Sequence, residues 1–341
     1  MTVVGPFGLS VQDQALETDV HLGLAAVEEA LGDATKSDVP FITVTAKHLM
    51  EAGGKRFRPL LVLLAAQFGD PNAPGVVPSA VVVELTHLAT LYHDDVMDEG
   101  LMRRGTVTAN ARWDNSVAIL TGDFLFSRAS KILAGLGPEA VRLQAEAFER
   151  LVTGQIQETA GPGPGEAPVQ HYLDVLAGKT GSLIAVSCRF GALLAGADER
   201  VTDILTQYGE RIGIAFQLSD DILDVASDSE ESGKTPGTDL REGVPTLPVL
   251  LLRAAEPDPS VPGDLRLREL LDQGFDPSLP DADARHAEAL RLLRAHPALS
   301  WAREQTLRYA EDARALLPPL PDCPAKSALE GLCDAVALRT M

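Results

Sequence analysis

A series of long apolar segments with helical periodicity is the feature that most constrains the fold of this chain. The segments are rich in alanine and leucine and nearly free of internal proline, and several are apolar on more than one face, as in the central helices of a large bundle. No alternating segment predicts a β-strand of useful length. We therefore expect an all-α fold of roughly 10–14 helices. The clearest expected helices lie within residues 20–34, 80–100, 117–136, 139–160, 180–197 and 201–228.

The composition supports one folded domain. Of the 341 residues, 45% are hydrophobic, which is too many for an intrinsically disordered chain. Three scattered cysteines are too few to form a disulfide framework, and no apolar run is long enough to span a membrane. We expect a single domain over residues 1–341. A flexible Pro- and Asp-rich stretch near 254–264 would precede its C-terminal helices.

The charge balance limits the partners. Lys and Arg number 29 against 49 Asp and Glu, a formal net charge of −20. Nucleic acid and anionic lipid headgroups would be repelled by such a chain, whereas an anionic substrate could bind through metal ions or a local basic cluster. The N-terminal residues lack a basic region ahead of an apolar stretch, so we expect no signal peptide and a cytoplasmic location.

The sequence Asp-Asp-Val-Met-Asp at residues 94–98 ends a long apolar segment. On a helix, Asp94 and Asp98 would share one face, about 6 Å apart along the axis. Like charges at this spacing destabilise a helix unless a cation lies between them, and oxygen ligands suit Mg²⁺. A solvated acidic helix end would explain this motif equally well when it is taken alone.

A second acidic motif favours the metal site over the solvated helix end. Asp-Asp-Ile-Leu-Asp at residues 220–224 repeats the pattern on another strongly apolar segment. Two such motifs on buried helices would face each other across one cavity, where six carboxylates without metal would repel one another strongly. Bridging Mg²⁺ ions and a diphosphate would resolve this repulsion.

A basic motif completes the pattern. Residues 53–59, GGKRFRP, place three cations at a glycine-rich helix start, and Arg103 and Arg104 follow the first acidic motif. Helix N-termini and arginine side chains favour phosphate. Any one of these arginines could be an ordinary surface residue, but the set indicates an anion-binding site.

The ordered motifs closely resemble the trans-isoprenyl diphosphate synthase (polyprenyl synthetase) family. They are GGKRFRP, ELTHLATLYHDDVMDEGLMRRG, GKTGSL, FQLSDDILD, and GKTPGTDL with TLP, and they lie within residues 53–248. The resemblance implies a helical bundle around a central cavity with both acidic motifs at its mouth. It also implies three Mg²⁺ ions, an allylic diphosphate and isopentenyl diphosphate as substrates, and a homodimer with transient membrane contact for product release.

The resemblance assigns roles to individual positions. For the metal it implies Asp94, Asp98, Asp220 and Asp224. For isopentenyl diphosphate it implies Lys55, Arg58, His87 and Arg104. For the allylic diphosphate it implies Arg103, Lys179, Thr180, Gln217 and Lys234. Asp94, Asp98, Asp220, Lys179 and Arg103 would act in catalysis. Gln155 would lie near the metal cluster. Arg339 matches the family's last arginine only loosely, so we assign it no role in the site.

The product length is the least constrained property. Thr90 and Ala89, four and five residues before Asp94, are small, whereas short-chain members often carry an aromatic side chain there. We therefore expect a medium- to long-chain product of about 30 to 50 carbons, as in quinone side chains, unless Phe124, Phe126 or Phe148 closes the channel. Three alternatives remain: a farnesyl or geranylgeranyl diphosphate synthase, a terpene cyclase, and a non-catalytic partner subunit.

Overall fold

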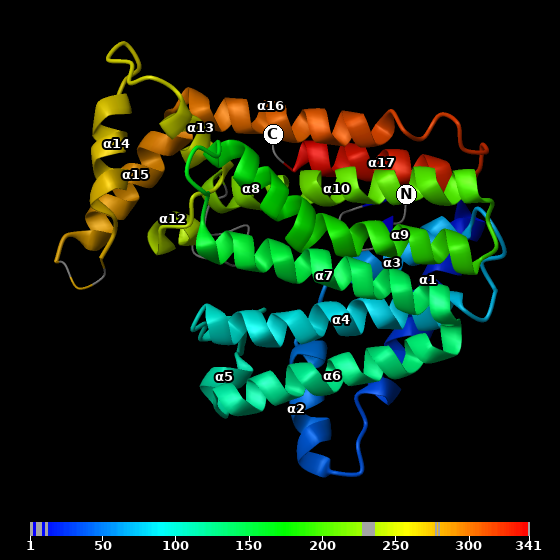
Figure 1. The fold of residues 1–341 in the computed structure, drawn as a ribbon. Helices are drawn as coiled ribbons and strands as arrows, with labels where there is room; N and C mark the ends of the chain where they lie inside the picture. The colour runs from blue at the N-terminus through cyan, green and yellow to red at the C-terminus, as the bar shows by residue number, and fades with distance from the viewer. Residues whose placement is uncertain are drawn as a thin grey trace. The chain divides into compact units, whose positions relative to one another are not determined.

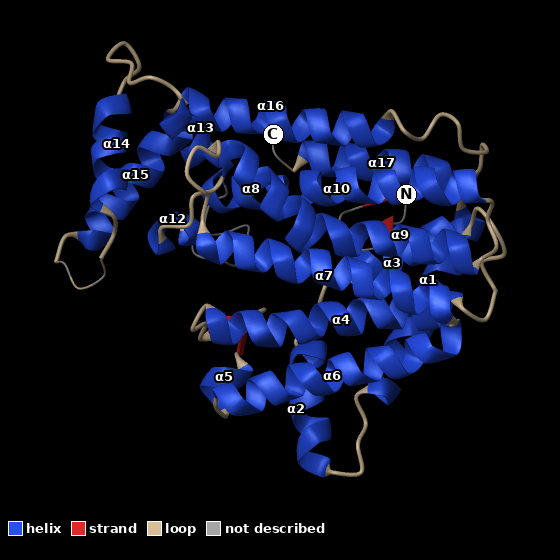
Figure 2. Ribbon diagram, viewed as in Figure 1, coloured by secondary structure: helices blue, strands red, loops and turns tan. Residues whose placement is uncertain are grey.

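The computed structural model of the chain describes residues 3–4, 9–10, 13–226, 236–276, 278 and 280–339. Regular structure in these residues is almost entirely helical, which confirms the predicted all-α class (Figure 2). The described residues form sixteen α-helices and one π-helical turn. This exceeds the expected number because helices of one or two turns, such as α5 (Ala109–Arg112) and α12 (Thr238–Glu242), are too short to show a periodic pattern.

The other helices are α1 (Gln14–Ala34), α2 (Pro40–Glu51), α3 (Phe57–Ala66), α4 (Val76–Met97), α6 (Asn115–Leu136), α7 (Pro138–Ala160), α8 (Pro168–Leu176), α9 (Ser182–Leu194), α10 (Glu199–Ala226), α13 (Leu247–Ala254), α14 (Asp264–Gln273), α15 (Ala282–Ala295), α16 (Pro297–Arg314) and α17 (Pro324–Leu338). The π-helical turn η1 spans Ala177–Gly181. Two small antiparallel hairpins pair β1 (Val3–Val4) with β2 (Leu9–Ser10) and β3 (Met102–Arg103) with β4 (Thr106–Val107).

The chain divides into two compact units. Unit 1 contains Met1–Leu151, Ser182–Glu210 and Arg314–Leu332, and unit 2 contains Val152–Gly181, Arg211–Ala313 and Cys333–Met341. Each unit has its own cluster of buried apolar side chains. The two acidic motifs fall in different units, because residues 94–98 belong to unit 1 and residues 220–224 to unit 2.

In unit 1, α4 lies beside α6 (Figure 1). Gly122 of α6 allows this close approach, since a Cβ atom there would collide with the imidazole of His93 and lie 3.1 Å from the carbonyl oxygen of Ala89. Most residues of α4 are buried, including apolar residues on more than one face. This burial agrees with the sequence pattern and makes α4 a central helix of unit 1.

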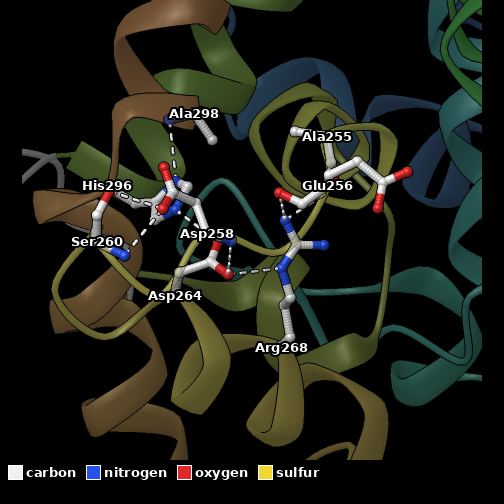
Figure 3. A network of polar contacts seen from close by, with 8 residues as sticks. All are labelled: Ala255, Glu256, Asp258, Ser260, Asp264, Arg268, His296 and Ala298. Atoms are coloured by element: carbon white, nitrogen blue, oxygen red, sulfur yellow. Dashed lines mark hydrogen bonds and ion pairs between the residues drawn. The ribbon is translucent and has the colours of Figure 1, made fainter.

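In unit 2, a polar network organises the stretch before α14 (Figure 3). The buried carboxylate of Asp264 accepts hydrogen bonds from Arg268 Nε at 3.0 Å and from the backbone N–H of Asp258 at 3.1 Å, and it lies 3.1 Å from His296 Nε2. Burial opposes ionisation of Asp264, but the hydrogen bonds from Arg268 and Asp258 outweigh it and lower the pKa. Arg268 also donates to the carbonyl of Ala255. The Pro- and Asp-rich stretch is thus held by side-chain contacts at both ends.

Candidate active site

The first acidic motif lies at the C-terminal end of α4, and its three aspartates differ in environment. Asp95 is only 1% exposed, whereas Asp94 is half-buried and Asp98 is exposed. Asp98 is the C-cap residue of α4, and its backbone N–H donates to the carbonyl of Asp94 at 2.8 Å. The two outer aspartates therefore lie one helical turn apart, as the spacing predicts, and both are more exposed than Asp95.

The middle aspartate is held by Arg103 of β3. Arg103 Nε donates to Asp95 Oδ1. Burial raises the pKa of Asp95, and the hydrogen bond from Arg103 opposes this shift. The structure thus gives Arg103 a carboxylate partner within unit 1, and its contact with the allylic diphosphate stays a prediction.

A basic cluster surrounds His87 in unit 1. Burial, followed by the positive charges of Arg58, Arg104 and Arg103, lowers the pKa of His87 well below its usual value. Burial also lowers the pKa of Arg58, to about 10. Arg58 and Arg104 therefore lie close enough to His87 for their charges to act on it. Such a cluster of positive charge is expected at a site that binds an anion.

The cluster is built on an unusual backbone turn. Arg56, the N-cap residue of α3, adopts the left-handed conformation with φ of 46°. Its guanidinium contacts the carboxylates of Glu28 and of the buried Glu84, the latter at 3.0 Å. Arg56 is therefore bound within the protein, and its neighbour Lys55 is exposed. The sequence motif shows three cations, but the fold uses one of them to shape the turn.

Arg104 is placed by the same turn. Its Nη1 atom donates to the carbonyl of Gly53, and a Cβ atom on Gly54 would lie 2.7 Å from this nitrogen. Glycine at position 54 therefore leaves room for the guanidinium.

Buried polar atoms without partners test whether these residues suit an anion. Among the described residues, Arg58 Nε has no hydrogen-bond partner, although it is buried. A buried N–H group without a partner costs free energy, and an oxyanion would satisfy it. The donors present in unit 1 thus fit a diphosphate group.

The second acidic motif lies near the C-terminal end of α10. As in the first motif, its middle aspartate is buried and its first aspartate is more exposed. Asp221 is 7% exposed, and the side chain of Asp220 is 37% exposed. Tyr172 of α8 donates its hydroxyl to Asp221 Oδ2, and Gln217 Nε2 donates to Asp221 Oδ1 at 3.0 Å. Burial raises the pKa of Asp221 to about 7, and burial together with the charge of Asp221 raises the pKa of Tyr172 well above its usual value.

Asp224 caps the short helix α12. Its two carboxylate oxygens accept hydrogen bonds from the backbone N–H groups of Thr238 and Asp239, each at 3.2 Å. A carboxylate oxygen has two acceptor positions, so these contacts are compatible with a metal ligand. The predicted role of Asp224 in metal binding stays a prediction.

The π-helical turn η1 carries Lys179 and Thr180. Lys179 Nζ forms an ion pair with Glu158 Oε2 at 2.5 Å, and the hydroxyl of Thr180 donates to Gln217 Oε1 at 3.4 Å. A Cβ atom on Gly154 of α7 would lie 2.6 Å from the backbone nitrogen of Lys179, so this glycine permits the close approach of α7 to the turn. Single π-helical turns are frequent at functional sites. Unit 2 thus brings together Thr180, Gln217 and Asp221.

Arg339 and Gln155 also belong to unit 2. Arg339 Nη2 donates to Asp220 Oδ1 at 2.6 Å. The sequence did not predict this contact, because its only signal was a loose match between Arg339 and the last arginine of the family. Gln155 Oε1 is buried and has no hydrogen-bond partner among the described residues. Lys234, predicted to bind the allylic diphosphate, lies outside the described residues.

Tyr92 and His93 of α4 make packing and hydrogen-bond contacts with other helices. Tyr92 is fully buried, donates its hydroxyl to the carbonyl of Thr45 at 2.5 Å and accepts from the N–H of Leu49 at 3.1 Å. His93 lies 3.1 Å from the carbonyl oxygen of Ile119 on α6 and 3.5 Å from a carboxylate oxygen of Asp123. Both side chains therefore connect α4 to neighbouring helices.

Among the described residues, no three His, Cys, Asp or Glu side chains are grouped as ligands of one metal ion. In the same residues, no helix is both long and apolar enough to cross a membrane. Any ion at either motif would need oxygen ligands beyond the outer aspartates, which a diphosphate and water can supply.

Comparisons with known proteins identify the family. The family model described as polyprenyl synthetase matches residues 39–275. The chain is 46% identical to a nonaprenyl diphosphate synthase of Mycobacterium tuberculosis over 97% of both chains. A crystal structure of geranylgeranyl pyrophosphate synthase from Corynebacterium glutamicum, complexed with calcium and isoprenyl diphosphate, superposes with a TM-score of 0.85 at 43% identity, covering 97% of this chain and 99% of the other.

A third comparison gives the same result at lower identity. Polyprenyl synthase from Caulobacter crescentus, also complexed with calcium and isoprenyl diphosphate, superposes with a TM-score of 0.85 at 32% identity and covers 99% of this chain and 98% of the other. The predicted family, fold class and enzyme class are therefore confirmed. The chain belongs to the polyprenyl synthetase family and is a prenyltransferase with the all-α isoprenoid synthase fold.

Proposed function

We propose that this protein condenses isopentenyl diphosphate with an allylic diphosphate to give a longer trans-polyprenyl diphosphate. The observation that carries the proposal is the basic cluster of Arg58, His87 and Arg104, which unit 1 combines with the outer aspartates of the first motif. Donors for one diphosphate and carboxylates for metal ions are what this reaction requires. The carboxylates Asp94, Asp98, Asp220 and Asp224 would hold three Mg²⁺ ions.

The residues have separate tasks in this proposal. Lys55, Arg58, His87 and Arg104 bind the diphosphate of isopentenyl diphosphate, and neutral His87 donates an N–H without adding charge. Arg103, Lys179, Thr180, Gln217 and Lys234 bind the allylic diphosphate. When bound, Mg²⁺ would help to neutralise the leaving diphosphate, so that the allylic carbon–oxygen bond ionises.

The remaining steps follow from the chemistry of the two substrates. The double bond of isopentenyl diphosphate attacks the allylic cation, and a proton then leaves to the released diphosphate. Apolar helix faces keep water away from the cation. The product is again an allylic diphosphate, so the cycle repeats. Both units serve this one reaction, as parts of one catalytic domain over residues 1–341.

The proposed product is of medium or long chain, about 30 to 50 carbons. It is supported by the small residues Ala89 and Thr90 before the first motif and by the similarity to a nonaprenyl diphosphate synthase. The second candidate is a geranylgeranyl diphosphate synthase, favoured by the similarity to the Corynebacterium glutamicum enzyme. A cytoplasmic homodimer, which would contact the membrane transiently to release product, completes the proposal.

Incubation of the purified protein with Mg²⁺, isopentenyl diphosphate and labelled farnesyl or geranylgeranyl diphosphate tests both candidates. We expect labelled products of 30 to 50 carbons that disappear when the metal is chelated. Products of 20 carbons would favour the second candidate, and no transfer to any starter would refute the proposed function.

A further inference from the structure

The middle aspartate of the second acidic motif is fixed by side chains of two helices. Asp221 is 7% exposed, although a carboxylate is costly to bury without donors. Its Oδ2 atom accepts a hydrogen bond from the hydroxyl of Tyr172 on α8. Its Oδ1 atom accepts one from the amide nitrogen of Gln217, which lies one turn earlier on α10. Both of its oxygens are therefore occupied by protein donors.

The orientation of Gln217 depends on this aspartate. The amide nitrogen of Gln217 donates to Asp221 Oδ1 at 3.0 Å, so this contact directs the nitrogen side of the amide toward Asp221. The amide oxygen then faces η1 and accepts the hydroxyl of Thr180 at 3.4 Å. A chain of hydrogen bonds thus runs from Tyr172 through Asp221 and Gln217 to Thr180, entirely within unit 2.

The middle aspartate of the first acidic motif is also held by a protein donor, but through one oxygen only, because its Oδ2 is buried and has no hydrogen-bond partner among the described residues. This residue, Asp95, is 1% exposed and accepts from Arg103, while Asp94 and Asp98 are more exposed. In each motif the middle carboxylate is held by the protein, and the outer carboxylates remain more accessible. A neutral tyrosine hydroxyl therefore occupies, at the second motif, the place that an arginine occupies at the first.

We propose that Tyr172 is a positioning residue for the allylic diphosphate. Acting through Asp221, it fixes the Gln217 amide and the Thr180 hydroxyl in the orientation that receives the diphosphate group. Tyr172 itself touches neither substrate. This inference rests on the proposed function, which places Gln217 and Thr180 at the allylic diphosphate.

The variant Tyr172→Phe tests the inference, because it removes the hydroxyl and keeps the ring. The matched control is Tyr208→Phe. Tyr208 is a fully buried tyrosine, and its hydroxyl donates to the backbone carbonyl of Leu329 at 2.8 Å. Removal of a residue that orients ligands costs about 10- to 100-fold in affinity or activity. We expect Tyr172→Phe to raise the KM of the allylic diphosphate by about 10-fold or more, with the KM of isopentenyl diphosphate unchanged.

A direct binding measurement separates this inference from the proposed function. Calorimetric titration of inorganic diphosphate with Mg²⁺ should show an affinity loss of about 10-fold for Tyr172→Phe and none for Tyr208→Phe. Equal values for the two variants, whatever their melting temperatures, would overturn the inference. If the wild type transfers no prenyl group, the proposed function fails, and the titration still decides whether Tyr172 affects a diphosphate site.

A second variant covers the case in which Tyr172→Phe does not fold. Asp221→Asn keeps the size of the side chain, but its amide nitrogen cannot accept a hydrogen bond from Tyr172 or Gln217. We expect the same selective rise in the KM of the allylic diphosphate and the same loss of affinity for inorganic diphosphate. Wild-type values for Asp221→Asn would overturn the inference.

Discussion

Arg339 Nη2 donates to Asp220 Oδ1 at 2.6 Å, so the first aspartate of the second acidic motif has a cationic partner. The guanidinium of Arg339 also lies over the ring of Phe216, with 5.2 Å between its carbon and the ring centroid. The side chains of Arg339 and Asp220 remain 21% and 37% exposed. Asp220 is therefore accessible to a ligand while its charge is partly balanced.

Removal of an outer aspartate should abolish most turnover without unfolding the protein. Asp94→Ala and Asp220→Ala each delete a proposed metal ligand from a side chain that is not fully buried. We expect turnover to fall by roughly 10²- to 10³-fold, the usual cost of losing one group that stabilises developing negative charge. Steady-state kinetics measures the loss, and far-ultraviolet circular dichroism checks the fold.

The control for this prediction is Asp203→Ala on α10, the helix of Asp220. Asp203 is 53% exposed and pairs with Arg189 at 3.0 Å, and exposed ion pairs contribute little. Its turnover should remain at the wild-type level. Near-normal turnover in both Asp94→Ala and Asp220→Ala would contradict the assignment of the two acidic motifs.

Arg58 and Lys179 should affect the KM values of different substrates. Arg58→Ala removes a donor from the basic cluster and should raise the KM of isopentenyl diphosphate by about 10- to 100-fold, as expected for a hydrogen bond to a charged group. Lys179→Ala should raise the KM of the allylic diphosphate instead. Arg142→Ala, which removes an exposed arginine of α7, should change neither constant. If each variant changed both constants equally, the two subsites would be misassigned.

The fold class and the family could be predicted from the sequence because they depend on helical periodicity and on motifs of fixed spacing. What each polar side chain contacts depends on tertiary packing. Arg56 and Arg58 look alike in the motif, but only the left-handed turn at Arg56 directs its guanidinium to Glu84. Likewise, the approach of Arg339 to Asp220 joins residues far apart in the chain, which no local pattern indicates.

The pKa of His87 predicts a specific loss of stability in acid. Burial and the charges of Arg58 and Arg104 hold this pKa well below the usual value of 6.5 in the folded protein. Below about pH 6.5 the unfolded chain therefore binds a proton that the folded chain does not. The free energy of unfolding then falls with decreasing pH, by up to about 1.4 kcal/mol per pH unit, and is unaffected above this range.

Urea unfolding of the wild type and His87→Asn between pH 5 and 8 isolates this contribution. The difference in free energy of unfolding, wild type minus variant, should be constant from pH 7 to 8 and should decrease from pH 6.5 to 5. Histidine-selective NMR of the wild type should show a neutral imidazole at pH 6. A difference that does not change with pH would mean that His87 titrates alike in both states.

The length of the product should be sensitive to Ala89 on α4. Ala89 is 1% exposed and lies one and a half turns before Asp94, about 7.5 Å along the helix axis. If the growing chain extends along α4 from the first acidic motif, a phenyl ring at this position would block it. Ala89→Phe should therefore shift the products to 15 or 20 carbons while turnover is retained, as measured by chromatography and mass spectrometry of the prenyl chains.

The competing explanation is that Ala89 only packs against α6, near Gly122, and that another residue closes the channel. In that case Ala89→Phe would behave like Ala46→Phe, a change at a fully buried alanine of α2 that should cost about 1–3 kcal/mol of stability without altering product length. The pair of Phe126 and Phe148, with ring centroids 4.1 Å apart, is then the next candidate. Lengthening of the product in Phe148→Ala, together with unchanged products in Ala89→Phe, would assign the closure to this pair. Wild-type products of 15 or 20 carbons would show that the small residues before Asp94 do not leave the channel open.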